Sequence, residues 1–440
     1  MAHRARLVVG PKGRPRDGRR RVVAVTLALA ALIGADRPAR AQSIDTILQW
    51  NRIMLTALGV SGASPATVFS TRPLAVVSVA VFDAVNSFDL VYVPYATRVA
   101  PAPGASRDAA AAQAAHDVLV VLMPSQTAVF DAALAASLAG IPTDAAREGA
   151  RVGSAVAQAT LELRAGDGWN RTPPAYELPS LPGYWKPTPP GNTAATFTHY
   201  PDVTGFIVPN GRHFLPEGPP SLSSPRYATD FNETKSIGAV NSTTRTADQT
   251  QMARLWAGVG TSTGLFGVWN QVVGTVARAR GLSGLDTARA FALANMAAHD
   301  GLMTSFTGKF LYGFWRPVTA IREADTDGND ATAADPAWTP LLGTPPYPGH
   351  PGNMSCVGAS QSRTLARVFG QDNIPFQVSW TVVPEGPAVT RPYNGFRELA
   401  DEEAVSRVWG GIHFTFETQA SMGACTQLAD YAADNYLRRR

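Results

Sequence analysis

Hydrophobic positions recur with helical spacing along most of the chain, and long alternating patterns typical of strands are scarce. Apolar residues three and four positions apart, with proline only near the ends of a segment, predict amphipathic helices. In the first half these segments are residues 71–86, 107–122 and 144–164. In the second half they are residues 247–259, 265–280, 286–305, 353–369, 396–407 and about 412–437. The pattern therefore predicts an all-α fold.

Residues 173–225 break this pattern, because they hold 13 of the 34 prolines. Proline removes a backbone donor and blocks helix interiors, so this segment is expected to be irregular. It still carries Trp185, Tyr200, Phe206 and Phe214, which a disordered linker would lack. We therefore expect an ordered Pro-rich wrap at 173–229, joining an N-terminal helical region at 42–172 to a C-terminal helical region at 230–440. The pattern thus predicts two helical halves joined by an ordered segment.

The first 41 residues have the parts of a secretory signal peptide. A region rich in arginine precedes an apolar run from Val22 to Ala35, and Ala39-Arg40-Ala41 resembles a cleavage site. A membrane anchor is the alternative, but this apolar run is short for one. The three arginines at 19–21 leave twin-arginine export open. The sequence predicts an exported protein, either periplasmic or extracellular.

The leader also explains the basic isoelectric point. The chain has a formal charge of +4, the leader holds +8, and the remainder is therefore net negative at −4. This distribution argues against nucleic-acid binding. No apolar window reaches the length of a membrane span. The two cysteines, Cys356 and Cys425, are compatible with one disulfide or with two buried thiols.

Three short segments of the second half, residues 309–317, 345–355 and 406–413, hold the candidate chemistry. Lys309 and Arg316 lie seven residues apart. On one helix this spacing is about 700°, so both cations would share a face. Pro317 follows Arg316, and we expect the helix to end there.

Arg407 and His413 are six residues apart, which on a regular helix is about 600° and places them on different faces. Gly410-Gly411 lies between them and can break the helix, which allows the two side chains to converge. Each residue alone has an ordinary explanation: Lys309 as a surface lysine, His413 as a core histidine. Only their ordered combination is specific.

The combination suits a tetrahedral oxyanion. Arginine offers paired donors to neighbouring oxygens, lysine adds a point charge, and histidine can act as nucleophile or metal ligand. The backbone N–H groups of Gly349 and Gly352 are candidates to complete the cradle. The candidate binding residues are therefore Lys309, Arg316, Arg407, Gly349 and Gly352, with His413 as the catalytic residue.

The order K-x6-R-P, a Pro/Gly/His loop and S-R-x5-H resembles the signature of vanadium haloperoxidases and type 2 phosphatidic acid phosphatases. The stretches FWRPVTAIREADTDGND and DPAWTPLLGTPPYP resemble bacterial haloperoxidase-like proteins in particular. The resemblance extends to Trp50-Asn51, to VFDAVNSF around Phe82 and to PGYWKPTPP around Trp185.

This resemblance implies two helical bundles, with vanadate held by Lys309, Arg316 and Arg407. It also implies that His413 bonds to the vanadium. Bound vanadate activates hydrogen peroxide as a Lewis acid, and the enzyme oxidises a halide. In the phosphatase branch, the matching histidine is phosphorylated by a phosphate ester and then hydrolysed.

The chain departs from the family at its middle motif, P-S-G-H, whose histidine is the acid/base. One alignment places His350 at that position, and the other places Met354 there, which cannot transfer protons. His350 is therefore a candidate catalytic residue, with a loop histidine capping the following helix as the alternative. A general acid/base of this kind typically increases the reaction rate by about 10²–10⁴-fold.

Three functions follow for this scaffold. The first is a vanadate-dependent haloperoxidase-like enzyme, the second is an exported acid phosphatase, and the third is a degenerate oxyanion-binding protein without turnover. The partners expected are small molecules: hydrogen peroxide, a halide or a phosphate ester. The acidic stretch 325–330 is interpreted as a polar turn, because its glycine is not where a calcium loop requires it. His299, next to Asp300, is interpreted as a core histidine paired with its own helix, with support of the oxyanion site as the alternative.

Overall fold

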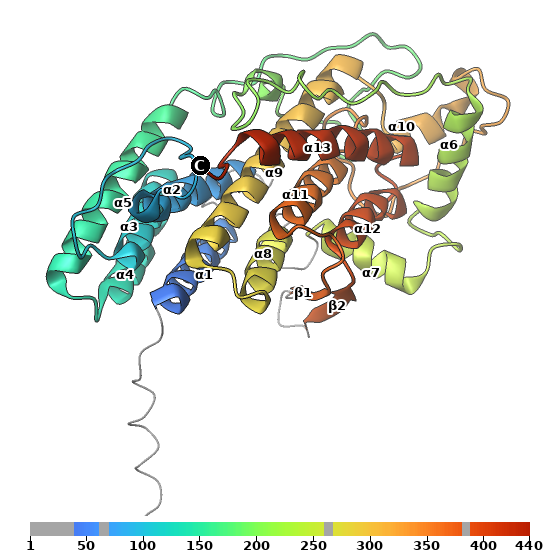
Figure 1. Cartoon of the computed structure of the whole chain (residues 1–440). Coiled ribbons are helices and arrows are strands. Elements are labelled where there is room, and N and C mark those ends of the chain that lie inside the picture. Colours follow the sequence, from blue (N-terminus) through green and yellow to red (C-terminus); the bar gives the residue numbers. More distant parts are fainter. Residues whose placement is uncertain (1–38, 61–69, 259–266, 381–387) are drawn as a thin grey trace, which may run out of the picture. The chain divides into compact units, whose positions relative to one another are not determined.

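The computed structural model describes residues 39–60, 70–258, 267–380 and 388–440 (Figure 1). Residues Ala39–Arg440 form one compact unit. The predicted signal peptide lies outside the described residues, apart from its last three positions, which begin the first helix. The proposed division at 172 and 229 stays a prediction.

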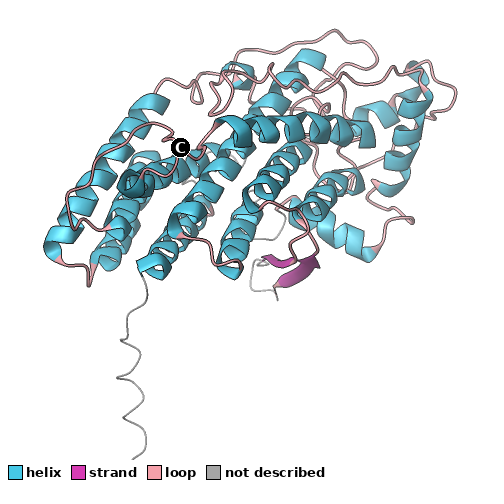
Figure 2. Ribbon diagram, in the orientation of Figure 1, coloured by secondary structure: helices cyan, strands magenta, loops and turns pink. Residues whose placement is uncertain are grey.

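The described residues are mostly helical, which confirms the all-α prediction (Figure 2). The helices of the first half are α1 (Ala39–Leu58), α2 (Thr71–Asp89), α3 (Arg107–Leu122), α4 (Thr127–Leu138) and α5 (Thr143–Arg164). Those of the second half are α6 (Pro225–Ile237), α7 (Ala247–Trp256), α8 (Gly267–Ala279), α9 (Gly284–Tyr312), α10 (Pro317–Arg322), α11 (Asn353–Phe369), α12 (Phe396–Trp409) and α13 (Thr415–Asn435).

One antiparallel hairpin, β1 (Phe376–Trp380) and β2 (Val389–Tyr393), is the only sheet among the described residues. It was absent from the sequence prediction. Each strand has five residues, so the alternation of buried and exposed positions is too brief to stand out from the surrounding pattern.

Helix α9 is the central element of the fold. It packs against α2 on one side and α11 on another, and α11 also packs against α12 and α13. From Leu285 to Lys309 nearly all of its side chains are buried. A helix that is apolar all round belongs in the core of a large protein. Helix α9 therefore carries its last turn, with Lys309, into the interior of the C-terminal half.

The Pro-rich segment is held against the helices by hydrogen bonds from the backbone N–H groups of its non-proline residues. The carboxylate of Asp300 on α9 accepts the N–H groups of Phe206, Ile207 and Val208 at 2.7–2.9 Å. Earlier in the segment, the Trp185 N–H donates to the Gly313 carbonyl at 2.7 Å. The segment is thus an ordered wrap. Helical structure resumes at Pro225 rather than near residue 230.

Lys309 and Arg316 do not share a helix, which corrects the spacing argument. Helix α9 ends at Tyr312 because Gly313 takes a left-handed conformation (φ 59°) and its N–H donates to Lys309 O. The chain then runs extended to Arg316, which is the N-cap of α10. The two cations instead meet through a turn of the chain.

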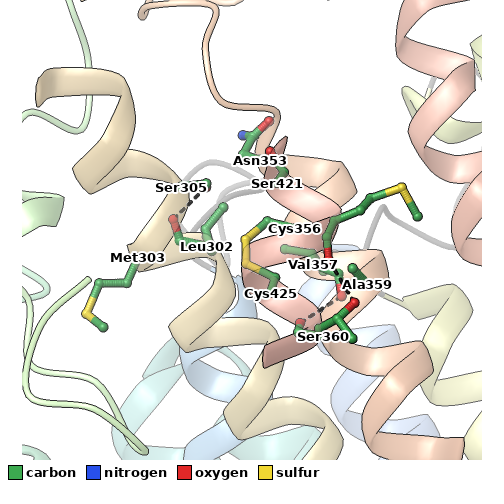
Figure 3. The surroundings of a disulfide bond; sticks show 12 residues. Leu302, Met303, Ser305, Asn353, Cys356, Val357, Ala359, Ser360, Ser421 and Cys425 are labelled. Atoms are coloured by element: carbon green, nitrogen blue, oxygen red, sulfur yellow. Dashed lines mark hydrogen bonds between the residues drawn. A yellow bond between two sulfur atoms is a disulfide. The ribbon is translucent and has the colours of Figure 1, made fainter. Parts of the chain in front are cut away.

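Cys356 of α11 and Cys425 of α13 are paired in a buried disulfide, with Cα atoms 5.2 Å apart (Figure 3). The Gly352 N–H, at the start of α11, donates to Glu417 O in the first turn of α13 at 3.0 Å. The covalent link and this hydrogen bond join the same two helices. Together they fix the start of α11 against the first half of α13.

Within the described ranges, no single helix meets the length and hydropathy expected of a membrane span. The bent pair formed by Arg107–Leu122 and Pro124–Leu138 meets them together, by length and composition alone.

Candidate oxyanion site

Lys309 is fully buried near the end of α9. Its Nζ donates to the carbonyl oxygens of Pro348 and Gly349, at 3.0 and 2.7 Å. Burial and the nearby Arg316 lower the pKa of Lys309 well below its ordinary value. A buried ammonium bound only to neutral carbonyls lacks a full counter-charge.

Arg316 is also fully buried, and its guanidinium is held in a fixed orientation. Its Nε donates to Tyr347 O and its Nη1 to Ile412 O, both at 2.8 Å. The Nη1 also lies 3.2 Å from His413 Nε2. Its Nη2 has no hydrogen-bond partner among the described residues. One donor edge of Arg316 is therefore free for a ligand.

Arg407 approaches from the last turn of α12 and is 7% exposed. Its Nη1 donates to Trp256 O at 3.2 Å, while its buried Nε has no partner in the described part of the chain. Burial lowers the pKa of Arg407 to about 10, and Tyr347 and Glu403 oppose this shift. Arg407 is thus a second buried cation with an unused donor.

His413 lies beside these cations because α12 ends before it. Gly411 has a φ of 73°, and a Cβ on it would stand 2.4 Å from Gly238 O. Only glycine fits this turn. The sequence prediction that Gly410-Gly411 breaks the helix between Arg407 and His413 agrees with this geometry.

The tautomer of His413 follows from its two neighbours. Arg316 has no acceptor, so His413 Nε2 must accept its N–H, and Nδ1 carries the proton. Nδ1 lies 2.5 Å from Glu417 Oε2, which also accepts the Phe414 N–H. Burial, followed by Arg316, Lys309 and Arg407, lowers the pKa of His413 well below its ordinary value. His413 is therefore neutral, with its Nε2 lone pair directed toward Arg316.

Two residues of this cluster were missed by the sequence reasoning. Glu417 is buried, and burial raises its pKa to about 7. The spacing His413-x3-Glu417 was the available signal, since residues four apart meet on a helix face. The ring of Tyr347 faces Arg316 and Lys309 at 5.0 and 5.4 Å. Nothing in the local sequence of Tyr347 distinguished it.

Gly349 and Gly352 do not present free backbone donors. The Gly349 N–H donates to Phe314 O at 2.8 Å, and the Gly352 N–H donates to Glu417 O at 3.0 Å. Gly349 instead contributes its carbonyl, which accepts from Lys309. A Cβ on Gly349 would lie 2.6 Å from Glu417 Oε1. This glycine therefore permits close packing against the cluster rather than donation to an anion.

His350 is buried, but its hydrogen bond leads away from the cations. Its Nε2 donates to Glu217 O at 2.7 Å, because a carbonyl can only accept. Burial lowers the pKa of His350 to about 4. Met354 lies in the first turn of α11, which begins at Asn353. Neither residue is hydrogen-bonded to Lys309, Arg316, Arg407 or His413 within the described part of the chain.

The cluster fits an anion in charge and in hydrogen bonding. Three buried cations face a neutral histidine, and burial raises the pKa values of both nearby carboxyl groups, Glu417 and Glu403. Arg316 Nη2 and Arg407 Nε are buried donors that lack partners among the described residues. Such donors are costly unless a ligand or water satisfies them. An oxyanion would supply both the charge and the acceptors.

Comparison with known proteins places this geometry in context. Residues 289–439 match the family described as the VCPO second helical-bundle domain. The chain is 24% identical over 346 residues to vanadium chloroperoxidase of Curvularia inaequalis, covering 61% of this chain and 56% of that protein. It thus spans little more than half the length of this relative.

Two solved structures share the fold. A bacterial vanadium-dependent iodoperoxidase matches with a TM-score of 0.75 and 22% identity, over 91% of this chain and 97% of that one. A bacterial vanadium-dependent chloroperoxidase matches with a TM-score of 0.69 and 18% identity, over 86% and 94%. Both alignments extend beyond the C-terminal bundle to most of the described fold.

Proposed function

We propose, for a chain that belongs to the haloperoxidase branch of the vanadium haloperoxidase and phosphatidic acid phosphatase superfamily, a vanadate-dependent enzyme that oxidises halide with hydrogen peroxide. The observation that carries this proposal is the set of three buried cations around His413 Nε2, with two donors left free. The relatives support the class of enzyme.

The residues would divide the work as follows. Lys309, Arg316 and Arg407 would hold the oxyanion, and His413 would bond to the vanadium through Nε2. Bound vanadate would supply Lewis-acid activation of peroxide. Glu417 accepts the Nδ1–H of His413 and so keeps the lone pair on Nε2. Bonding through Nε2 would require its lone pair to be released from the contact with Arg316 Nη1 at 3.2 Å.

The position of His350 favours a second candidate, an oxyanion-binding protein without turnover. His350 donates to Glu217 O, and burial lowers its pKa to about 4. Met354 has no proton to transfer. If neither residue serves as acid/base, anion binding would persist while catalysis is lost.

One set of assays separates the candidates. The mature protein is incubated with vanadate, peroxide, bromide and a phenolic halogen acceptor, and separately with p-nitrophenyl phosphate. We expect halogenation that requires vanadate. Phosphate release inhibited by vanadate would establish the phosphatase instead. Vanadate binding by calorimetry without either reaction would identify the binding protein, and an absence of binding would refute all three.

We also propose that the chain is exported. Its buried Cys356–Cys425 disulfide supports this, because such bonds persist in oxidising compartments. The test is fractionation of cells that express the full chain, followed by N-terminal sequencing of the product. We expect an extracytoplasmic protein that begins near Gln42. An intact N-terminus in the cytoplasmic fraction would contradict export.

A further inference from the structure

A cavity lies between the Pro-rich segment and α13, which are green and dark red in Figure 1. Its volume is about 470 Å³, within the range of small-molecule sites. One wall is the outer face of α13, where Ala420, Gly423 and Ala424 leave a shallow surface. The aromatic ring of Phe416 and the side chain of His350 also line it.

His350 gives this cavity a specific hydrogen-bonding requirement. Its Nε2 donates to Glu217 O at 2.7 Å, so its Nδ1 carries a lone pair. That Nδ1 has no partner among the described residues, although the side chain is fully buried. Since burial keeps the pKa of His350 at about 4, the ring is neutral at pH 7 and Nδ1 is an acceptor. A ligand that satisfies it must bring a donor.

The rest of the lining indicates the charge of the ligand. Arg212 and Arg226 stand at the exposed side, against one carboxylate, Glu217. Arg226 is held at the rim by a hydrogen bond from Nη2 to Gln419 Oε1, at 3.1 Å. The lining therefore has an excess of positive charge and one unprotonated, buried imidazole nitrogen. It also includes the aromatic ring of Phe416 and the small residues of α13.

The cavity is separate from the oxyanion cluster. The chain at Gly349 and His350 lies between the cavity and the cluster. Gly349 O accepts a hydrogen bond from Lys309, while the next residue, His350, lines the cavity. Lys309, Arg316, Arg407 and His413 are not among the residues that line it.

We propose that this cavity binds a small aromatic carboxylate that carries a phenolic hydroxyl. The hydroxyl donates to His350 Nδ1, the ring packs between Phe416 and the small residues of α13, and the carboxylate meets Arg212 and Arg226. This site goes beyond the proposed function, because its ligand binds without vanadate or peroxide.

The test uses the mature chain and 4-hydroxybenzoate, titrated by calorimetry without vanadate. The comparison ligand is 4-methoxybenzoate, which keeps the ring and the charge but cannot donate. We expect 4-hydroxybenzoate to bind about tenfold more tightly, the usual effect of one buried hydrogen bond. Equal affinities, or no saturable binding at millimolar concentration, would overturn the proposal.

Two variants locate the site. Gly423→Leu fills the cavity, and a Cβ at this position meets nothing within 4 Å, so the fold should be retained. We expect it to reduce 4-hydroxybenzoate binding at least about tenfold. Ala136→Leu, which adds the same side chain to the exposed face of α4, is the matched control and should bind like wild type. Unchanged binding in Gly423→Leu would place the ligand elsewhere.

His350→Phe tests the role of the nitrogen. The variant keeps an aromatic ring but loses the acceptor, so the preference for the hydroxyl over the methoxy compound should disappear. A preference that survives would assign the hydroxyl to another partner. Saturating vanadate should leave 4-hydroxybenzoate binding unchanged in the wild type, and competition between them would show that the two sites are one.

Discussion

At the scale of single residues, Glu417 is the group through which α13 acts on the oxyanion cluster. Its Oε2 lies 2.5 Å from His413 Nδ1 and accepts the Phe414 N–H at 3.1 Å. The imidazole is therefore fixed in one tautomer and one orientation before any ligand arrives. A histidine without such a partner would populate both tautomers, and only one exposes the Nε2 lone pair to the site.

We predict that Glu417→Ala weakens oxyanion binding by about 10–100-fold, the range seen when a partner of a ligating histidine is removed. Glu417→Gln should retain most of the affinity, because its amide oxygen can still accept the Nδ1–H. The measurement is vanadate titration by calorimetry. If the alanine variant binds vanadate like wild type, Glu417 does not position His413.

Glu403 gives the protein a pH-dependent stability. It is fully buried, its Oε2 accepts the Trp269 N–H at 2.8 Å, and burial raises its pKa to about 8. The unfolded state therefore releases this proton more readily than the folded state. The contribution to stability is present below the unfolded pKa near 4.5 and is lost as pH rises through about 8.

We predict that Glu403→Gln loses less stability than wild type between pH 5 and pH 8, because glutamine does not ionise and still accepts from Trp269. Each unit of pKa difference corresponds to about 1.4 kcal/mol in the free energy of unfolding. Urea unfolding at both pH values measures the effect, with Glu162→Gln on the exposed face of α5 as control. Parallel losses in wild type and Glu403→Gln would contradict the assignment.

At the scale of elements, the turn after α12 determines whether Arg407 and His413 meet. Gly411 has a φ of 73°, and a Cβ added to it would lie 2.4 Å from Gly238 O. We predict that Gly411→Ala destabilises the protein by more than Gly104→Ala. Gly104 has a similar φ of 80° but nothing within 4 Å of its Cβ position.

The strain of a left-handed alanine costs about 1–2 kcal/mol, and both variants carry it. Only Gly411→Ala adds the collision with Gly238, so its loss should be about 1 kcal/mol larger or more. The difference in the free energy of unfolding is measured in urea. Equal losses would mean that the turn relaxes without cost.

The sequence predicted most helices because their signals are local. The segments 107–122 and 353–369 match α3 and α11 in both bounds. The prediction that Lys309 and Arg316 share one helix was wrong, because the helix ends at a left-handed turn at Gly313, whose carbonyl accepts the N–H of the distant Trp185. The hairpin and the placement of Tyr347 likewise depend on contacts between remote segments. The residue types of the cluster were readable, whereas its partners and free donors required the fold.

At the scale of the whole molecule, the disulfide closes a loop of 69 residues between α11 and α13. We predict that replacing both Cys356 and Cys425 with alanine lowers the free energy of unfolding by about 2–4 kcal/mol, mainly through greater freedom of the unfolded chain. Urea unfolding measures the loss. Reductant should destabilise wild type toward the value of the double variant and leave the double variant unchanged. An identical midpoint in both proteins would exclude a stabilising bond.

The central position of α9 has a consequence for how the protein can be divided. A fragment of residues 230–440 would retain Lys309, Arg316, Arg407 and His413, and the matched domain begins within α9 at residue 289. Yet α9 packs on α2, and its Asp300 anchors the Pro-rich wrap. Excision of this fragment would expose the apolar face of α9 that packs on α2, and it would leave the Asp300 carboxylate without its hydrogen-bond donors. The oxyanion cluster therefore depends structurally on the N-terminal helices. A recombination event that separates the two parts would have to be accompanied by polar substitutions on the exposed face of α9.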